Sequence, residues 1–402
     1  MIKTLLTTLI IALSATLFAQ SWEAYNEFPA SASGRNHPIT FSIGDTGYIL
    51  TGYGDRAGSE MSDFYKFDSQ TETWVKAADF AGGARGFGYG VSTNGKGYAG
   101  FGLFVNSAKN DLWEYDPTTG EWTELTSCPC TPRWHPALIA IDDKIYMGLG
   151  SSAIGNLGDW YEYDITNDTW TKKQDFPGTV RHHPYYFPIG DQAYVGLGHG
   201  AGIYNDFYRY DPNTETWTQV ANLPDQGRVA GTQFTYNGKG YVLSGQGDTH
   251  QNLPTGEFWE YDPTFNQWTS LPAHPGTGRW APGNWVINDR AYFIAGRSDK
   301  EEKDIMKYDF KIAANTQEID APNEITIFPN PTNGVIQFSN PHSIHVVNAS
   351  ILSAQGKKLQ DLNKAVTDLN FEIDLTGYTS GLYFINIELE NGKTISKQIM
   401  KK

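Results

Sequence analysis

The sequence is poor in cysteine, in positive charge and in long apolar runs beyond its first residues. Only Cys128 and Cys130 occur among 402 residues, which excludes a disulfide-stapled scaffold and an array of zinc fingers. The 30 lysines and arginines are outnumbered by 45 aspartates and glutamates. The resulting net charge of −15 opposes phosphate backbones, so no nucleic acid is expected as a partner. No later apolar run has membrane-spanning length, so no membrane span is expected in the mature chain.

The single long apolar run lies at the N-terminus. Lys3 supplies a positive charge, residues 5–18 are mainly apolar, and Ala19 is a small residue ahead of Gln20. This order is typical of a cleaved secretory signal. We therefore predict a signal peptide at residues 1–19 and an exported mature protein.

Aromatic residues are plentiful, and the tryptophans recur with a fixed period. Five of them are spaced 48, 48, 47 and 51 residues apart: Trp74, Trp122, Trp170, Trp217 and Trp268. An aspartate lies six residues before each: Asp68, Asp116, Asp164, Asp211 and Asp262. An arginine lies eleven residues after each: Arg85, Arg133, Arg181, Arg228 and Arg279. Each period holds four short β-rich runs separated by turn residues, which predicts one propeller blade per period.

The ends of this array predict six blades. The last unit, which begins at Arg279, has Asn315 where the spacing requires a tryptophan, so it lacks its fourth strand. At the other end, Trp22 precedes Arg35 by 13 residues without a unit of its own. A strand around Trp22 would complete the sixth blade and remove two exposed sheet edges. The predicted fold is therefore all-β, with a six-bladed propeller over residues 20–310.

The period and the turns resemble the kelch repeat, which has about 50 residues per unit. The resemblance covers roughly residues 21–310. Where kelch repeats have a double glycine, this chain has Gly-x-Gly, as at Gly148 and Gly150.

A second domain is predicted after a polar linker at residues 311–323. Residues 324–402 contain no tryptophan, arginine or cysteine, and alternating runs at 381–389 and 394–399 predict a hairpin in a small Ig-like β-sandwich. ITIFPNPTNG at 325–334 and LTGYTSGLYFINIELENGKTISKQIMKK at 375–402 resemble the C-terminal sorting domain of type IX secretion cargo of Bacteroidetes. The resemblance implies that residues 324–402 address the chain to that secretion machinery.

Candidate ligand-binding residues lie in the long connections, which all open on one face because strand direction alternates within a blade. All seven propeller histidines lie there or at the start of a first strand, including His274. The arginine positions are constant and their neighbours vary, as expected of a binding site on a rigid scaffold. The predicted ligand-binding residues are Arg35, His37, Arg85, Arg133, Trp134, His135, Arg181, His182, His183, His199, Arg228, His250, Arg279 and Trp280.

Two roles are open for the repeat arginines. Their planar guanidinium groups suit carbonyls and carboxylates between adjacent blades. They equally suit a channel mouth where, beside Trp134 and Trp280, they would bind sugars or carboxylated ligands. The repeat aspartates, by contrast, are assigned to turns, because Asp-Pro-x-Thr sequences cap themselves.

The sequence favours a secreted or cell-surface module that binds a carbohydrate or a protein. The alternative is an enzyme resembling the bacterial sialic-acid mutarotases, a sugar mutarotase or epimerase with an acid and a base among Asp55, Glu60, Asp248 and His250. No cofactor and no metal are expected. A galactose-oxidase-like enzyme needs copper and a tyrosine joined to a cysteine, whereas Cys128 and Cys130 are expected to bond to each other.

Overall fold

The structure is a computed structural model that describes residues 22–29, 31–54, 59–253, 257–310, 326–339, 346–353, 357–362, 370–389 and 394–402. These residues belong to two compact units, one within residues 1–311 and one within residues 312–402, which are described separately. The predicted signal peptide, residues 1–19, and the predicted linker, residues 311–323, lie outside the described residues. Within the described ranges, no helix has the length and apolar character needed to cross a bilayer.

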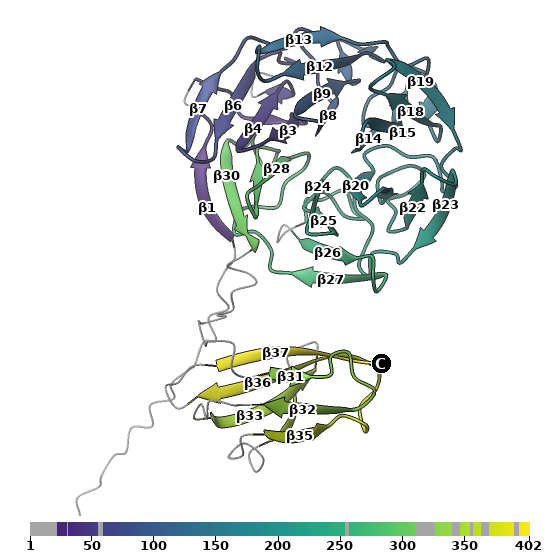
Figure 1. Cartoon of the computed structure of the whole chain (residues 1–402). Helices are drawn as coiled ribbons and strands as arrows, with labels where there is room; N and C mark the ends of the chain where they lie inside the picture. Colours follow the sequence, from purple (N-terminus) through teal and green to yellow (C-terminus); the bar gives the residue numbers. More distant parts are fainter. Residues whose placement is uncertain are drawn as a thin grey trace, which may run out of the picture. The chain divides into compact units, whose positions relative to one another are not determined.

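Six four-stranded antiparallel sheets stand radially around a common axis in the first unit (Figure 1). Blades 1 to 3 are β3(Ile39–Ile43), β4(Thr46–Leu50), β6(Phe64–Asp68), β7(Thr73–Lys76); β8(Tyr89–Thr93), β9(Lys96–Gly100), β12(Leu112–Asp116), β13(Glu121–Glu124); and β14(Ala137–Ile141), β15(Lys144–Gly148), β18(Trp160–Asp164), β19(Thr169–Lys173). Blades 4 and 5 are β20(Tyr185–Ile189), β21(Gln192–Gly196), β22(Phe207–Asp211), β23(Thr216–Val220); and β24(Thr232–Tyr236), β25(Lys239–Leu243), β26(Phe258–Asp262), β27(Gln267–Leu271). Blade 6 is β28(Gly283–Ile287), β29(Arg290–Ile294), β30(Asp304–Asp309) and β1(Trp22–Glu27). The first strands of neighbouring blades contact each other around the whole ring.

The N-terminal strand closes the ring, as predicted. β1 pairs antiparallel with β30, and Trp22 lies opposite Tyr308. This register repeats that of the other blades, where Trp170 lies opposite Tyr163 and Trp217 opposite Tyr210. Trp22 is therefore the sixth repeat tryptophan.

The repeat tryptophans also join neighbouring blades. The indole N–H of Trp170 donates to the carbonyl of Thr126 at 2.7 Å, which lies four residues after the repeat tryptophan of the preceding blade. Trp217, Trp268 and Trp22 make the same bond, to Gln174, Ala221 and Pro272. The indole N–H groups of Trp74 and Trp122 have no such partner among the described residues. Their rings still pack on aromatic residues of the neighbouring blade, so burial between blades is the role that the repeat tryptophans share.

The repeat aspartates act in turns, as predicted. Asp116 Oδ1 accepts from the backbone N–H of Thr118 at 2.8 Å, and Asp211 accepts from that of Asn213 at 2.9 Å. Backbone hydrogen bonds to the carboxylate lower the pKa of Asp116. These carboxylates lie in the tight turns between third and fourth strands, away from the long connections.

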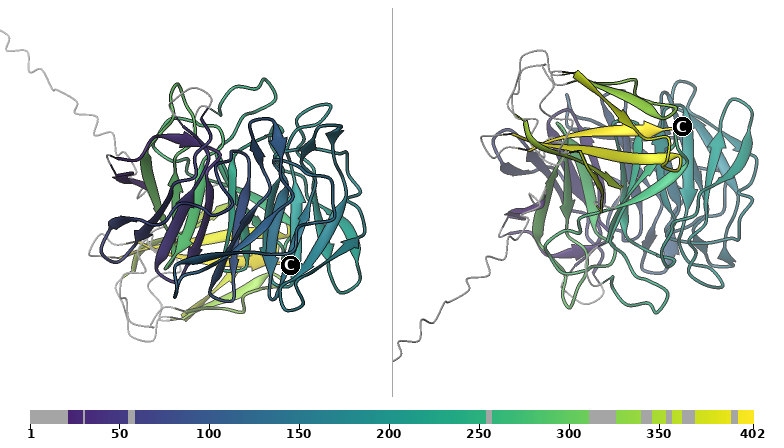
Figure 2. Two further views of the ribbon diagram at one scale, coloured as in Figure 1. Left: turned by 90° about the horizontal axis from the view of Figure 1, so that it is seen from above. Right: turned by 90° about the horizontal axis from the view of Figure 1, so that it is seen from below.

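Each long connection lies on one face, termed here the long-connection face. It carries the segments between second and third strands and those between one blade and the next, because the strands of each blade run between the two faces of the disc (Figure 2). Three two-stranded ladders lie on this face. β2(Arg35–Asn36) pairs with β5(Tyr53–Gly54) of another connection, whereas β10(Leu103–Phe104) with β11(Ser107–Ala108), and β16(Ser151–Ser152) with β17(Gly155–Asn156), each lie within one connection.

The second unit is a β-sandwich. One sheet contains β31(Thr326–Phe328), β32(Val335–Ser339) and β35(Asn370–Asp374); the other contains β34(Lys358–Asp361), β33(Val346–Ser353), β36(Gly381–Leu389) and β37(Thr394–Lys401). Side chains from both sheets, among them Ile336, Ile351 and Ile385, form one buried core. β36 and β37 are the predicted hairpin.

Candidate functional site

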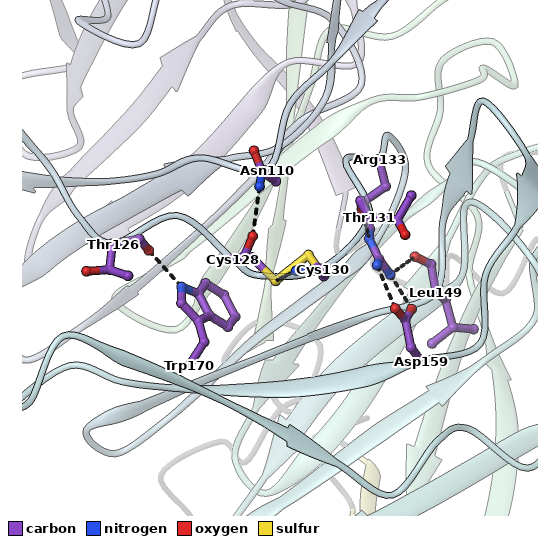
Figure 3. The surroundings of a disulfide bond; sticks show 9 residues. All are labelled: Asn110, Thr126, Cys128, Cys130, Thr131, Arg133, Leu149, Asp159 and Trp170. Carbon is purple, nitrogen blue, oxygen red and sulfur yellow. Dashed lines mark hydrogen bonds and ion pairs between the residues drawn. A yellow bond between two sulfur atoms is a disulfide. The ribbon is translucent and has the colours of Figure 1, made fainter.

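Each repeat arginine is buried and bound to a carboxylate of its own blade. All six are 0–1% exposed. The pairs are Arg35–Asp63, Arg85–Asp111, Arg133–Asp159, Arg181–Asp206, Arg228–Glu257 and Arg279–Asp304. In blade 3, Arg133 donates to both carboxylate oxygens of Asp159 at 2.5 and 2.8 Å, and to the carbonyl of Leu149 at 3.0 Å (Figure 3). The arginines are therefore not accessible to a ligand, which corrects their assignment as ligand-binding residues.

The main chain of each repeat arginine, in contrast, joins adjacent blades. Its carbonyl accepts from the N–H of the glycine that lies 17 residues after the arginine of the preceding blade, as when Gly150 donates to Arg181 at 2.9 Å. Gly150 has a φ of 94°, and a Cβ there would lie 2.8 Å from the carbonyl oxygen of Trp134, so only glycine fits. The expected bridge between blades thus exists, but the backbone makes it while the guanidinium binds within its own blade.

The position two residues after each arginine forms a ring around the axis, termed here the axial ring. Its members all have φ between 48° and 64°: His37, Phe87, His135, His183, Ala230 and Ala281. Successive members are linked through the main chain, as His135 donates to the carbonyl of Phe87 at 3.0 Å and His37 to that of Ala281 at 2.9 Å. Each member lies two residues before the start of a first strand, so the ring caps a central channel of about 250 Å³ that the first strands enclose.

Burial keeps the histidines near the axis neutral. Desolvation, reinforced by the neighbouring imidazoles, lowers the pKa of His37 to about 3 and that of His182 to about 4. The same causes hold the pKa values of His135 and His183 well below the ordinary range. Each ring therefore carries one proton near pH 7 and offers one lone pair.

One amide sets the position of the proton on His37. Asn36 Nδ2 donates to Glu301 Oε2 at 2.8 Å, since a carboxylate can only accept. Asn36 Oδ1 consequently faces Nδ1 of His37 at 2.5 Å and accepts its proton. His37 therefore carries its lone pair on Nε2.

The remaining protons follow along a chain of histidines. Nε2 of His37 accepts from Nε2 of His183 at 2.8 Å, and Nδ1 of His183 accepts from Nδ1 of His182 at 2.7 Å. Nε2 of His182 then accepts from Nδ1 of His199 at 3.1 Å. The chain runs from the buried axial ring to His199, which is only partly buried and whose ring contacts exposed His250.

His135 stands apart from this chain. Its ring stacks on His183 with centroids 3.4 Å apart, and its side is covered by Phe87. It is 7% exposed, and neither ring nitrogen has a hydrogen-bond partner among the described residues. One ring nitrogen from each of His37, His135 and His183 lies within 4.8 Å of the others, an arrangement suited to a metal ion. No metal was predicted from the sequence.

The histidines are less exposed than predicted. His37, His135, His183 and His274 are 3–7% exposed, so they do not open on the long-connection face. His274 lies apart from the axial ring, against Phe293. Positions that precede the first strands point toward the axis, where six blades leave too little space for solvent.

A polar cavity of about 590 Å³ opens on the long-connection face between blades 5 and 6. Its lining combines one indole with amide, hydroxyl and charged groups: Gln246, His250, Gln251, Asn252, Thr277, Gly278, Trp280, Arg297, Ser298 and Asp299. Trp280 also contacts His37 edge-on at 4.5 Å, so it separates the cavity from the axial ring. Arg297 is oriented by Glu301 at 2.7 Å.

Some of the residues predicted to bind a ligand or to act in catalysis line this cavity, and others lie outside it. His250 and Trp280 line the cavity, whereas half-buried Trp134 lies outside its lining. Among the candidate acids, Asp55 lies outside the described residues. Glu60 accepts from the hydroxyl of Tyr53 at 3.1 Å. Asp248 is exposed and is not part of the cavity lining.

A second variable position went unrecognised in the sequence. The residue that lies 18 positions after each repeat arginine pairs across a short ladder with the residue that directly follows the same arginine, as Arg297 does with Trp280 and Gln246 with Val229. Both positions vary from blade to blade, while the arginine and the glycine that directly precede them stay constant. That contrast could have identified Gln246 and Arg297 as site residues.

Cys128 and Cys130 are joined in a disulfide on the connection between blades 2 and 3 (Figure 3). Asn110 holds this segment by donating to the carbonyl of Cys128 at 2.7 Å. Both sulfurs are used in this bond, so neither is available for the tyrosine cross-link of a galactose-oxidase-like centre.

Comparisons with known proteins agree with this architecture. Residues 89–306 match the profile of the Attractin/LZTR1 β-propeller family. Residues 326–402 match that of the secretion system C-terminal sorting domain. A solved structure titled "Structure of YjhT" superimposes with a TM-score of 0.59 at 17% identity, over 69% of this chain and 95% of that one, which establishes a shared fold. No curated protein matches the chain.

Proposed function

Since this chain belongs to the Attractin/LZTR1 β-propeller family, we propose that its propeller is a ligand-binding module with a carbohydrate-binding cavity between blades 5 and 6. The sorting domain at residues 326–402 marks the chain for export to the cell surface or the medium by type IX secretion. The ligand is accordingly a glycan met outside the cell.

The composition of the cavity carries this proposal. Trp280 offers a flat apolar face on which a sugar ring can stack. Around it, Gln251, Ser298 and Asp299 supply donors and acceptors for hydroxyl groups. A few convergent polar groups around an aromatic wall are what a small-ligand site requires, and about 590 Å³ accommodates a short oligosaccharide.

Replacing Trp280 with alanine is expected to weaken glycan binding by about 2 kcal/mol, roughly 30-fold, because it removes the stacking surface. Screening the exported protein on a glycan array identifies the ligand, and calorimetry with that glycan measures the change. Trp134→Ala is the matched control, since Trp134 occupies the same repeat position in blade 3 but lies outside the cavity lining. Equal loss in both variants, or none in either, contradicts the proposed site.

A second candidate function is sugar mutarotation or epimerisation. It is favoured by one observation: His250 and Asp299, an imidazole and a carboxylate, line the same cavity and could act as base and acid. Anomer-exchange NMR with sialic acid distinguishes the candidates, because a binding module leaves the exchange rate at its uncatalysed value. Acceleration that disappears in Asp299→Asn favours the enzyme.

Removing residues 324–402 is expected to leave the propeller folded in the periplasm of a host with this secretion system. The propeller closes on its own chain through β1 and β30, so the truncation breaks none of its sheet pairing. Fractionation followed by immunoblotting measures the distribution. Appearance of the truncated protein outside the cell contradicts the address role of the sorting domain.

A further inference from the structure

We propose that His37, His135 and His183 form a binding site for a divalent transition-metal cation of the zinc and copper class on the propeller axis. The three imidazoles come from blades 1, 3 and 4 and are 4–7% exposed. One ring nitrogen from each lies within 4.8 Å of the other two. Imidazole is a preferred ligand of zinc and copper, and the set contains no carboxylate of the kind that calcium and magnesium require.

The unpartnered imidazole of His135 is the first observation that points to an ion. Both of its ring nitrogens are buried without a hydrogen-bond partner among the described residues. Leaving such polar atoms buried and unpaired costs free energy that the stacking contact with His183 does not offset. Coordination of one nitrogen to a cation removes this cost for that nitrogen.

The hydrogen bonds that orient the imidazole of His37 are the second observation that points to an ion. Metal-bound histidines usually donate their other ring N–H to a carbonyl or carboxylate, which fixes the ring and aims the lone pair. His37 donates Nδ1–H to Asn36 Oδ1, and Asn36 is itself held by buried Glu301. The lone pair on Nε2 is thereby directed at His183 Nε2, 2.8 Å away.

The histidine chain allows His183 to become a ligand without losing its outer hydrogen bonds. Moving the proton of His183 from Nε2 to Nδ1 lets it donate to Nδ1 of His182. His182 then donates from Nε2 to Nδ1 of His199, whose own proton moves from Nδ1 to Nε2. Each ring retains one proton, so the only hydrogen bond replaced by the metal is that between His37 and His183. Three neutral imidazoles leave a fourth tetrahedral position for water or a ligand.

Calorimetric titration of the chelator-treated full chain with Zn²⁺ tests the site. We expect one equivalent of Zn²⁺ per chain, no stoichiometric binding in His135→Ala, and unchanged binding in His250→Ala, which removes an exposed imidazole. Asn36→Ala should bind about 10–100-fold more weakly, because it removes only the group that orients His37. Absence of binding to the unaltered chain, or equal loss in His250→Ala, overturns the proposal.

Spectroscopy of the unaltered chain keeps the test independent of whether the variants fold. Cu²⁺ replaces Zn²⁺ at imidazole sites. The nitrogen hyperfine pattern of its electron paramagnetic resonance spectrum counts the bound rings. Three imidazole nitrogens support the site, and any smaller number overturns it.

Discussion

Asp159→Ala is expected to lower the free energy of unfolding of the propeller by about 3–5 kcal/mol. The substitution leaves the guanidinium of Arg133, which is 0% exposed, without the carboxylate that receives both of its terminal nitrogens. The guanidinium itself stays buried, so the folded state keeps most of the cost of removing this charge from water. Urea denaturation followed by tryptophan fluorescence measures the loss.

Two further variants isolate the cause. Asp175→Ala removes a carboxylate that pairs with Lys172 where both side chains are more than half exposed, so a change below about 1 kcal/mol is expected. Replacing Arg133 with methionine and Asp159 with leucine together should recover much of the stability, because no unpaired charge remains. If Asp159→Ala is no more harmful than Asp175→Ala, the repeat arginines do not stabilise the blades.

Trp22→Ala is expected to destabilise the propeller by about 3–5 kcal/mol, the usual loss for a buried tryptophan. Trp22 is 4% exposed, packs on Phe258 and Tyr308, and donates to the carbonyl of Pro272. Its loss opens a cavity where the two ends of the propeller meet. Thermal melts of the full chain measure the effect.

Two further variants test whether β1 closes the propeller. Glu23→Ala alters the next residue of β1, whose side chain is 58% exposed, and should change stability by less than about 1 kcal/mol. Deleting residues 22–27 also exposes the edge of β30, so the deleted protein should associate through that edge in light scattering. A monomeric deletion variant with an unchanged melting temperature rules out closure by β1.

The fold was largely predictable because a propeller repeats local chemistry. The spacing of Trp170, Asp164 and Arg181 recurs because blades 1 to 5 each contain a turn-capping aspartate and a tryptophan packed on the neighbouring blade, and every blade contains a buried arginine. The missing tryptophan after Asp309 and the additional Trp22 together predicted six blades and their closure, which the pairing of β1 with β30 confirms. The sorting-domain hairpin followed from plain alternation of apolar and polar residues.

The site was less predictable, because the regularity that identifies an arginine says nothing about where its side chain points. Arg133 and its equivalents had been placed at a ligand surface or between blades, yet each binds a carboxylate that lies 25–29 residues later in its own blade. Asp159 and its equivalents went unnoticed because aspartate is common in connections. Burial, which decides the role of such a pair, is a property of the assembled disc.

The amino-acid sequence by itself determined the blade, the number of blades, the closing strand and the sorting domain, because each depends on residues close together in the chain or on a count of repeats. Only the tertiary structure decided that His37, His135 and His183 meet on the axis and that Trp280 shares a cavity with His250 and Arg297. The three histidines come from blades 1, 3 and 4, and closure of the ring brings these equivalent positions to a common axis. The cavity residues come from blades 5 and 6, and the packing of these two blades brings His250 to Trp280 and Arg297.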